Sequence, residues 1–162
     1  MIKIKKLLAN RWKEYKNLRL EALRKDATAF GSSYEDEAKL SEAEWKKRIK
    51  NTLFALSNDE LIGMIVYVFN NKRKIKHIAN IFGFYVKEIN RNQGIGKKLV
   101  ESALSSIMKD KNVIKINLNV NPKQKAAVKL YRKFGFKVVG LLKKDLFVNS
   151  KFYDELIMEK FI

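Results

Sequence analysis

The segment Arg91-Asn92-Gln93-Gly94-Ile95-Gly96-Lys97 is the first place in the chain where the spacing of residue types suggests chemistry, because a helical pattern begins inside it. A helix start has backbone N–H groups without partners and the positive end of the helix dipole, so it suits an anion. Glycine at positions 94 and 96 lets the backbone approach phosphate oxygens without a Cβ in the way. Arg91, Lys97 and Lys98 add positive charge. We therefore predict that this loop binds a phosphate group.

Three other interpretations of the loop compete at the level of the sequence. A Walker loop needs Gly-Lys followed by Ser or Thr, and Gly96-Lys97-Lys98 lacks the hydroxyl group that would hold Mg²⁺. A dinucleotide-binding fold has a third glycine and places its glycines in the first strand–helix unit, whereas this loop follows four expected strands. The third alternative is a plain turn with glycines at a helix start, which the loop alone does not exclude.

A second segment, further downstream, narrows these alternatives. It consists of Asn121-Pro122 followed by the run from Ala127 through Leu130-Tyr131 to Gly135-Phe136. Together the two segments resemble the GNAT superfamily of acetyltransferases, whose signatures are Arg/Gln-x-x-Gly-x-Gly/Ala and Asn-x-x-Ala-x-x-Leu-Tyr-x-x-x-Gly-Phe. The stretches 18–33 and 154–158 are also similar to members of the family, so the resemblance covers nearly the whole chain.

The resemblance implies that an amine attacks the thioester carbonyl of acetyl-CoA directly, with Tyr131 as the general acid for the leaving thiolate. A phenol keeps its proton at neutral pH and can donate it; packing against the apolar face of its helix is the alternative role. The resemblance further implies that backbone N–H groups near residues 84–86 stabilise the developing oxyanion. The residues expected to bind acetyl-CoA are Phe84, Tyr85, Val86, Arg91, Asn92, Gln93, Gly94, Ile95, Gly96, Lys97 and Asn121. Gln124 stands where the family often has Asn, which makes Asn121 the better candidate.

The general base is harder to place. An alkyl ammonium has a pKa near ~10.4 and must lose a proton before it attacks. In many relatives a Glu lies on the strand before the loop, but residues 80–86 contain no acid. Other candidates are the acidic run Glu35-Asp36-Glu37, which could equally be a solvated helix face, and His77. The small polar segment 30–34 is expected to line the acceptor groove.

The composition excludes several kinds of site and leaves the partners partly open. The chain has no cysteine and one histidine, so neither a thiolate nor a multi-histidine metal site is expected, nor a disulfide. The net charge of +18, from 35 Lys and Arg against 17 Asp and Glu, attracts polyanions. These cations are spread along the chain, which favours a compositional origin over nucleic-acid binding. No apolar run is long enough to span a bilayer and no signal peptide is evident, so we expect a cytoplasmic protein.

Two functions from different classes follow. The first is an acetyl-CoA-dependent N-acetyltransferase that acts on a primary amine of a small molecule or a protein, with no metal. The alternative is a CoA-binding module with weak or no catalysis that acts through its basic surface on RNA or ribosomes. Nucleic acid is not the favoured partner, no membrane partner is expected, and homodimerisation stays open.

The elements that must position these residues form a mixed α/β domain over residues 1–162, with the GNAT fold: a mixed sheet, antiparallel N-terminal strands and about four helices. Periodicity predicts strands at 2–8, 52–56, 61–69, 75–86, 114–120, 136–142 and 152–158. Helices are expected after Asn10, which could cap the first one, after the capping box that Ser41 and Glu44 form, at 94–110, and from Pro122 to a C-terminal cap at Gly135.

Overall fold

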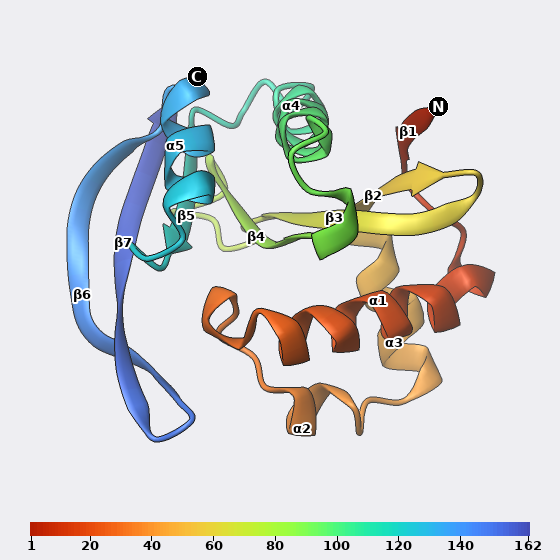
Figure 1. Cartoon of the computed structure of the whole chain (residues 1–162). Coiled ribbons are helices and arrows are strands. Elements are labelled where there is room, and N and C mark those ends of the chain that lie inside the picture. The colour runs from red at the N-terminus through yellow and green to blue at the C-terminus, as the bar shows by residue number, and fades with distance from the viewer. The chain divides into compact units, whose positions relative to one another are not determined.

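The computed structural model describes residues 1–162 as an α/β fold with a mixed seven-stranded sheet in the order β1-β2-β3-β4-β5-β7-β6 (Figure 1). The strands are β1 (Ile2–Lys5), β2 (Thr52–Ser57), β3 (Glu60–Phe69), β4 (Ile78–Val86), β5 (Lys115–Val120), β6 (Lys137–Val148) and β7 (Lys151–Phe161). The helices are α1 (Trp12–Lys25), α2 (Tyr34–Glu37), α3 (Glu42–Arg48), α4 (Ile95–Ile107) and α5 (Lys125–Lys133), with four short 3-10 turns between elements. The expected fold class is confirmed.

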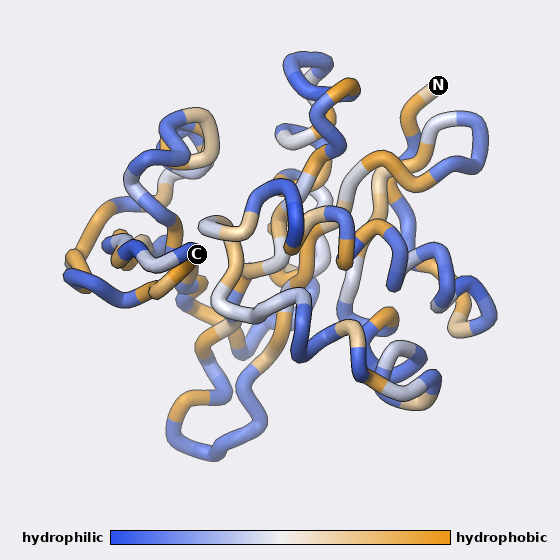
Figure 2. The backbone as a smooth tube through the Cα atoms, turned by 60° about the horizontal axis from the view of Figure 1, so that its bottom comes forward, coloured by the Kyte–Doolittle hydropathy of each residue, from blue (hydrophilic) through white to orange (hydrophobic).

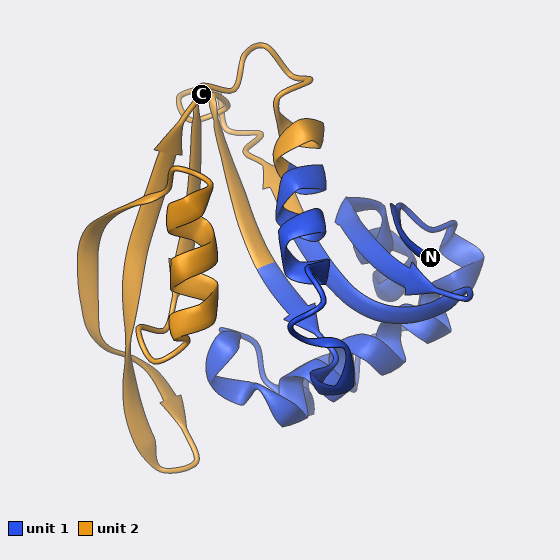
Figure 3. Ribbon diagram, turned by 45° about the horizontal axis from the view of Figure 1, so that its top comes forward, with its two compact units in different colours: residues 1–66, 83–103 blue, residues 67–82, 104–162 orange.

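The chain divides into two compact units, which Figure 3 distinguishes by colour. Unit 1 comprises residues 1–66 and 83–103, and unit 2 comprises residues 67–82 and 104–162. The strand β4 and the helix α4 each begin in one unit and end in the other. Residues 91–97, which are expected to bind a phosphate group, therefore belong to unit 1, whereas Asn121 and Tyr131 belong to unit 2.

Unit 1 packs its first three helices around an aromatic core. The strands β1, β2 and β3 pair antiparallel, as expected. The β2–β3 connection is a short turn, whereas α1, α2 and α3 lie between β1 and β2. Trp45 of α3 is fully buried, and the ring of Tyr15 in α1 meets both Trp45 and Phe54 edge-on at centroid distances of 5.3 Å. Burial of apolar and aromatic surface is the main stabilising contribution here.

Unit 2 is built on a long hairpin. The strands β6 and β7 pair antiparallel, β7 pairs antiparallel with β5, and β5 pairs in parallel with β4 over Ile78–Asn80 and Lys115–Asn117. The second half of β4 lies outside this three-residue register. Most of the outer turns of the backbone tube are hydrophilic, and hydrophobic stretches alternate with them along the chain (Figure 2).

Local sequence signals for helix ends have mixed outcomes. The capping box is confirmed, because the Ser41 hydroxyl accepts from Glu44 N and the Glu44 carboxylate accepts from Ser41 N. Gly135 ends α5 at φ +87°, and Phe136 N donates to the Tyr131 carbonyl at 3.1 Å. The cap expected at Asn10 is wrong. A 3-10 turn occupies Ala9–Arg11 and α1 begins after Arg11 without a side-chain cap.

The C-terminal strands were the largest error in the expected boundaries. Residues 143–151 were expected as a loop, but both strands continue through this stretch to a two-residue turn at Asn149 and Ser150, which have φ values of 48° and 61°. Positive φ at both turn positions is the geometry that matches the twist of a hairpin. The strand was missed because the residues after Leu142 are polar and do not alternate. The structure has a register shift there, between Leu142 and Leu146, which interrupts the alternation.

Candidate functional site

The loop 91–94, within the segment expected to bind a phosphate group, links the end of β4 to the start of α4. Asn92 and Gly94 both have positive φ, 62° and 75°, which turns the chain into the helix. Lys98 N donates to the Gly94 carbonyl at 3.1 Å and closes the first helical turn. The N–H groups of residues 94–97 donate to no backbone carbonyl, so four donors lie together at the positive end of α4.

Two glycines shape this loop and its support. A Cβ placed on Gly94 would meet no atom within 4 Å, so this side of the loop is open. A Cβ on Gly63 of β3 would lie 2.9 Å from the Tyr85 carbonyl oxygen and 3.2 Å from Cδ1 of Leu99. Gly63 therefore permits the close approach of β3, β4 and α4 that fixes where the loop begins.

Arg91, expected to add charge to the loop, is anchored by protein contacts. One of its terminal nitrogens, Nη2, lies 2.6 Å from Oδ2 of Asp26, and Nε donates to the Val86 carbonyl at 3.0 Å. Its guanidinium also stands over the Tyr85 ring at 5.8 Å. In this geometry Arg91 fastens the loop to the end of α1 and to the end of β4.

The strand residues expected to bind the donor differ in burial. Tyr85 is buried, whereas Phe84 and Val86 are half-buried. The Tyr85 hydroxyl donates to Oε1 of Glu21 at 2.8 Å. Burial, followed by this hydrogen bond, raises the pKa of Tyr85 above its ordinary value, so the phenol keeps its proton. Glu21 is thus a carboxylate that reaches β4 from α1 although β4 itself has none.

A kink in β4 lies just before these residues. Gly83 has φ +61°, and a Cβ there would lie 2.8 Å from Cγ2 of Val66 and 3.1 Å from Nη1 of Arg19. Both the backbone conformation and the lack of space require glycine at this position. Arg19 Nη1 is buried and has no hydrogen-bond partner.

Three charged side chains from three helices form what we call the Glu37 cluster. They are Arg19 of α1, Glu37 of α2 and Arg48 of α3. Arg19 donates from Nε and Nη2 to the two Glu37 oxygens at 2.9 Å each, and Arg48 Nη1 donates to Glu37 at 3.0 Å. Burial opposes ionisation of Glu37, but the two guanidinium groups outweigh it and lower its pKa. A buried carboxylate held as an anion by two arginines is poorly suited to accept a proton, so Glu37 is unsuitable as the general base.

The other base candidates are also placed by the structure. Glu35 and Asp36 are exposed on α2, and the Asp36 carboxylate accepts from the Ser33 hydroxyl at 2.8 Å. His77 is half-buried immediately before β4, at the opposite end of this strand from Phe84 and Val86.

The expected acceptor segment, residues 30–34, is held by two arginines of α1. The Arg19 guanidinium stands over the Phe30 ring at 4.7 Å. Arg24 stands over the Tyr34 ring at 4.0 Å and donates to its hydroxyl at 2.7 Å. Between these anchors Gly31 and Ser32 are exposed.

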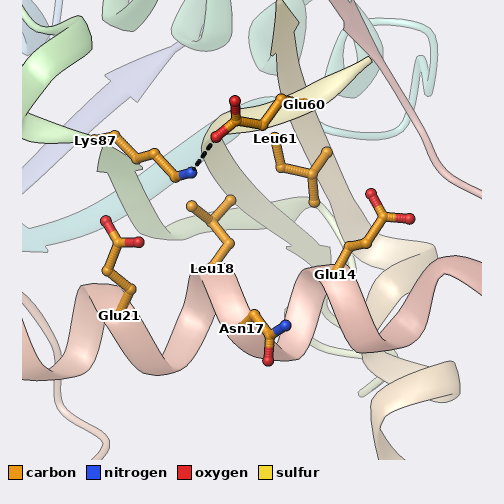
Figure 4. A pocket seen from close by; sticks show the side chains of 7 residues that line it. All are labelled: Glu14, Asn17, Leu18, Glu21, Glu60, Leu61 and Lys87. Atoms are coloured by element: carbon orange, nitrogen blue, oxygen red, sulfur yellow. Dashed lines mark hydrogen bonds and ion pairs between the residues drawn. The ribbon is translucent and has the colours of Figure 1, made fainter.

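A pocket of about 200 Å³ lies between α1 and the start of β3, with Lys87 at its edge (Figure 4). Three glutamates line it, and each already has a cationic partner. Glu60 accepts from Lys87 at 2.7 Å, Glu14 accepts from Arg11 Nε at 2.7 Å, and Glu21 lies 3.7 Å from Lys25. Because these charges are paired internally, the pocket offers no free anion for an amine substrate.

Unit 2 contains the remaining expected residues. Tyr131 of α5 is buried, with its ring edge-on to Phe136 at 5.7 Å, and burial raises the pKa of its hydroxyl. Asn121 is also buried, and its Oδ1 accepts from Lys123 N at 2.9 Å, whereas its Nδ2 has no partner. Gln124 is the residue before α5 and makes no side-chain cap.

Two further properties concern metals and membranes. No group of three or more His, Asp or Glu side chains is placed to hold a metal ion. None of the helices has the length and apolar character needed to cross a bilayer.

Comparisons with known proteins agree on one family. The model of the acetyltransferase (GNAT) family matches residues 12–136. An L-amino acid N-acetyltransferase of Escherichia coli strain K12 is 24% identical over 121 residues, which cover 72% of this chain and 74% of that protein. Among solved structures, a GNAT-family acetyltransferase of Streptococcus pneumoniae superposes with a TM-score of 0.89 at 22% identity over 100% of both chains. A phosphinothricin acetyltransferase of Sinorhizobium meliloti, in complex with AcCoA, gives a TM-score of 0.81 at 17% identity over 99% of this chain and 88% of that one.

Proposed function

Because this chain belongs to the acetyltransferase (GNAT) family, we propose that it is an acetyl-CoA-dependent N-acetyltransferase that transfers the acetyl group directly to a primary amine. The observation that carries the proposal is the set of four free N–H groups at residues 94–97, where α4 begins directly after the loop that follows β4. These donors suit a pyrophosphate because they combine hydrogen bonding with the positive end of the helix dipole.

Each unit, taken by itself, has features that suit a ligand carrying phosphate and amide groups. In unit 1, the open side of Gly94 leaves room for phosphate oxygens against the backbone. The backbone of residues 84–86 lies outside the β4–β5 register and could pair with the amides of an extended pantetheine arm. In unit 2, the buried and unpartnered Nδ2 of Asn121 is a donor that a bound ligand would satisfy.

The proposed reaction is a direct transfer of the acetyl group from sulfur to nitrogen. The amine first gives its ammonium proton to water and its nitrogen then attacks the thioester carbonyl carbon. As the carbon–sulfur bond breaks, the nitrogen gives a second proton to water. Backbone N–H groups near residues 84–86 stabilise the negative charge that develops on the carbonyl oxygen. The Tyr131 hydroxyl donates its proton to the leaving thiolate, and its raised pKa keeps this proton in place at neutral pH.

The acceptor class that we propose to test first is the L-amino acids. The supporting fact is that the Escherichia coli relative is named an L-amino acid N-acetyltransferase. Residues 30–34 are proposed to line the acceptor groove, because Arg19 and Arg24 fix the two ends of this segment and leave Gly31 and Ser32 exposed. Release of CoA should be measured over a panel of amino acids, small amines, polyamines and peptides with free N-termini.

A charge reversal in the loop tests the donor site. We expect Lys97→Glu to weaken acetyl-CoA binding about tenfold, because it places an anion in the first turn of α4 where the pyrophosphate binds. Lys47→Glu on α3 is the matched control, since Lys47 is also exposed and makes no ion pair. Calorimetric titration with acetyl-CoA measures both affinities.

The outcomes separate the enzyme from the alternative module. If Lys97→Glu and Lys47→Glu bind acetyl-CoA equally well, the loop is not the pyrophosphate site. If the protein binds acetyl-CoA tightly but acetylates no amine of the panel, the enzyme proposal fails and a CoA-binding module is supported.

A further inference from the structure

The positive charge of the protein is distributed unevenly between its two units. Unit 2 contains 17 Lys and Arg against 5 Asp and Glu, whereas unit 1 contains 18 against 12. Lysine and arginine are therefore equally numerous in the two units, but the acidic residues that balance them lie mainly in unit 1.

Within unit 2, the outward face of α5 carries unpaired cations. Lys125, Lys129, Arg132 and Lys133 are all exposed, and none of them forms an ion pair. With Pro122 and Val128 they line a groove of about 600 Å³. Their spacing places them on one side of the helix, which is the side opposite the apolar residues that pack on the sheet.

An exposed aromatic pair lies on the hairpin of the same unit. The side chains of Phe147 and Phe152 are 65% and 59% exposed, and their ring centroids are 4.8 Å apart. Lys144 Nζ stands 5.8 Å from the Phe152 ring. The two-residue turn at Asn149 and Ser150 joins the strands directly, so the hairpin presents these rings on a paired, regular backbone.

The helix and the aromatic pair share one face of the sheet. At the C-terminal end of α5, Lys160 Nζ would lie 2.9 Å from a Cβ on Gly135, which places the Lys160 face of β7 toward the helix. Alternate residues of a strand share a face, so Phe152 lies on the face of Lys160. At the other end, Lys123 Nζ stands over the Tyr153 ring at 5.2 Å. The helix thus runs alongside β7, and the segment that leads into it reaches the level of Tyr153 along the strand, although the Tyr153 ring lies on the face opposite Phe152.

We propose that α5 and the β6–β7 hairpin form a docking surface for single-stranded nucleic acid. The α5 cations contact successive phosphates, and Phe147 and Phe152 stack with bases next to the start of the helix. This combination of a basic track and exposed aromatic rings is what single strands require, because every base has a face on which a ring can stack. An acidic protein would use the cations but gives no role to an exposed ring pair, whereas an anionic membrane would take up both, so binding to vesicles is an outcome of the test.

The test measures binding of a fluorescein-labelled, unstructured RNA of about 12 nucleotides to the full-length protein by fluorescence anisotropy. With about four phosphates neutralised, log K should fall with log salt with a slope of about −3. Phe152→Ala should weaken binding by roughly fivefold or more, the lower limit for loss of one base stack. Lys125→Gln/Lys129→Gln should weaken it and reduce the salt slope by about 1.4.

Matched controls separate this surface from general attraction. Lys47→Gln/Lys50→Gln removes the same charge from exposed residues of unit 1. Its affinity for the RNA should be reduced less than that of Lys125→Gln/Lys129→Gln. Thermal unfolding of each variant should match the wild type, since all the replaced side chains are exposed.

Five results would overturn the proposal. Equal loss of binding in the two lysine pairs would assign the attraction to net charge. Unchanged binding by Phe152→Ala, or equal affinity for heparin and for the RNA, would remove the stacking component. Stoichiometric displacement of the RNA by acetyl-CoA would assign the α5 cations to the cosubstrate. Binding to phosphatidylserine vesicles without binding to RNA would assign the surface to a membrane.

Discussion

Replacing Glu37 with glutamine should lower the free energy of unfolding by about 3 kcal/mol, because Arg19 then stays buried without its counter-charge. The side chains of Glu37 and Arg19 are 3% and 7% exposed, whereas that of Arg48 is 41% exposed. Arg48 can therefore turn to water when Glu37 is neutral, and its own loss should be about 0–1 kcal/mol. Arg19 has no such alternative.

The magnitude follows from the contacts of Arg19. Its Nε and Nη2 donate to Glu37 and its Nη1 has no partner. Removing one member of a buried pair generally costs about 3–5 kcal/mol. A glutamine oxygen can still accept one hydrogen bond, so the lower end of this range applies. The apolar double variant Arg19→Met/Glu37→Leu should recover most of the loss, because it leaves no buried charge.

Urea unfolding at pH 7 measures these differences, with Glu35→Gln as the matched control. Glu35 precedes Glu37 on the same helix and is exposed, so its replacement should change stability by less than about 0.5 kcal/mol. A loss below about 1 kcal/mol for Glu37→Gln, with an unchanged m-value, would refute the assignment of Glu37 as a buried ionic anchor.

The same cluster predicts a pH dependence. The pKa of Glu37 is lower in the folded protein than in the unfolded chain. Its ionisation therefore stabilises the fold fully above the unfolded pKa of about 4.3, and this contribution is lost as the pH falls through the folded pKa. The difference in unfolding free energy between wild type and Glu37→Gln should accordingly shrink below about pH 4, as urea titrations at successive pH values would show.

Three other predictions concern single side chains. Tyr131→Phe should lower turnover while the affinity for acetyl-CoA, measured by calorimetry, stays nearly intact; unchanged turnover would remove Tyr131 from the mechanism. Gly83→Ala should destabilise the fold by about 1–3 kcal/mol in urea unfolding, because the position has φ +61° and no room for a Cβ, while Gly31→Ala, in open space, should be near neutral. Tyr85→Phe should cost about 1 kcal/mol through the hydrogen bond lost to α1, and an unchanged melting curve would count against that bond.

Features that depend on neighbours along the chain could be predicted from the sequence. The capping box at Ser41 and the helix end at Gly135 were found because their hydrogen bonds close within a few residues. The start of α4 was expected at Gly94 and lies at Ile95, between the two glycines, and it was found for the same reason. The fold class followed from the order of these elements and from the resemblance to a known family.

Features that depend on residues distant in the chain could not be predicted from the sequence. Glu37 looks like a third member of an exposed acidic run, and its burial depends on Arg19, 18 residues earlier. Gly83 lies inside a strand pattern, and the need for glycine there comes from Val66. A glycine within an apolar strand was the one available signal, since such a residue often marks a bulge or a close approach. Nothing local distinguishes Glu37 from Glu35.

The net charge of the protein is less informative than the positions of its charged residues. In unit 1 the cations outnumber the acids by only 18 to 12, and even the pocket glutamates have partners such as Lys87. In unit 2 the cations outnumber the acids more than threefold, and those on α5 are left for solvent or for a ligand. Unpaired like charges on adjacent turns of a helix repel one another and destabilise it by a few tenths of a kcal/mol per pair. A polyanion that neutralises them relieves this repulsion, so binding of nucleic acid should raise the melting temperature of the wild type more than that of Lys125→Gln/Lys129→Gln.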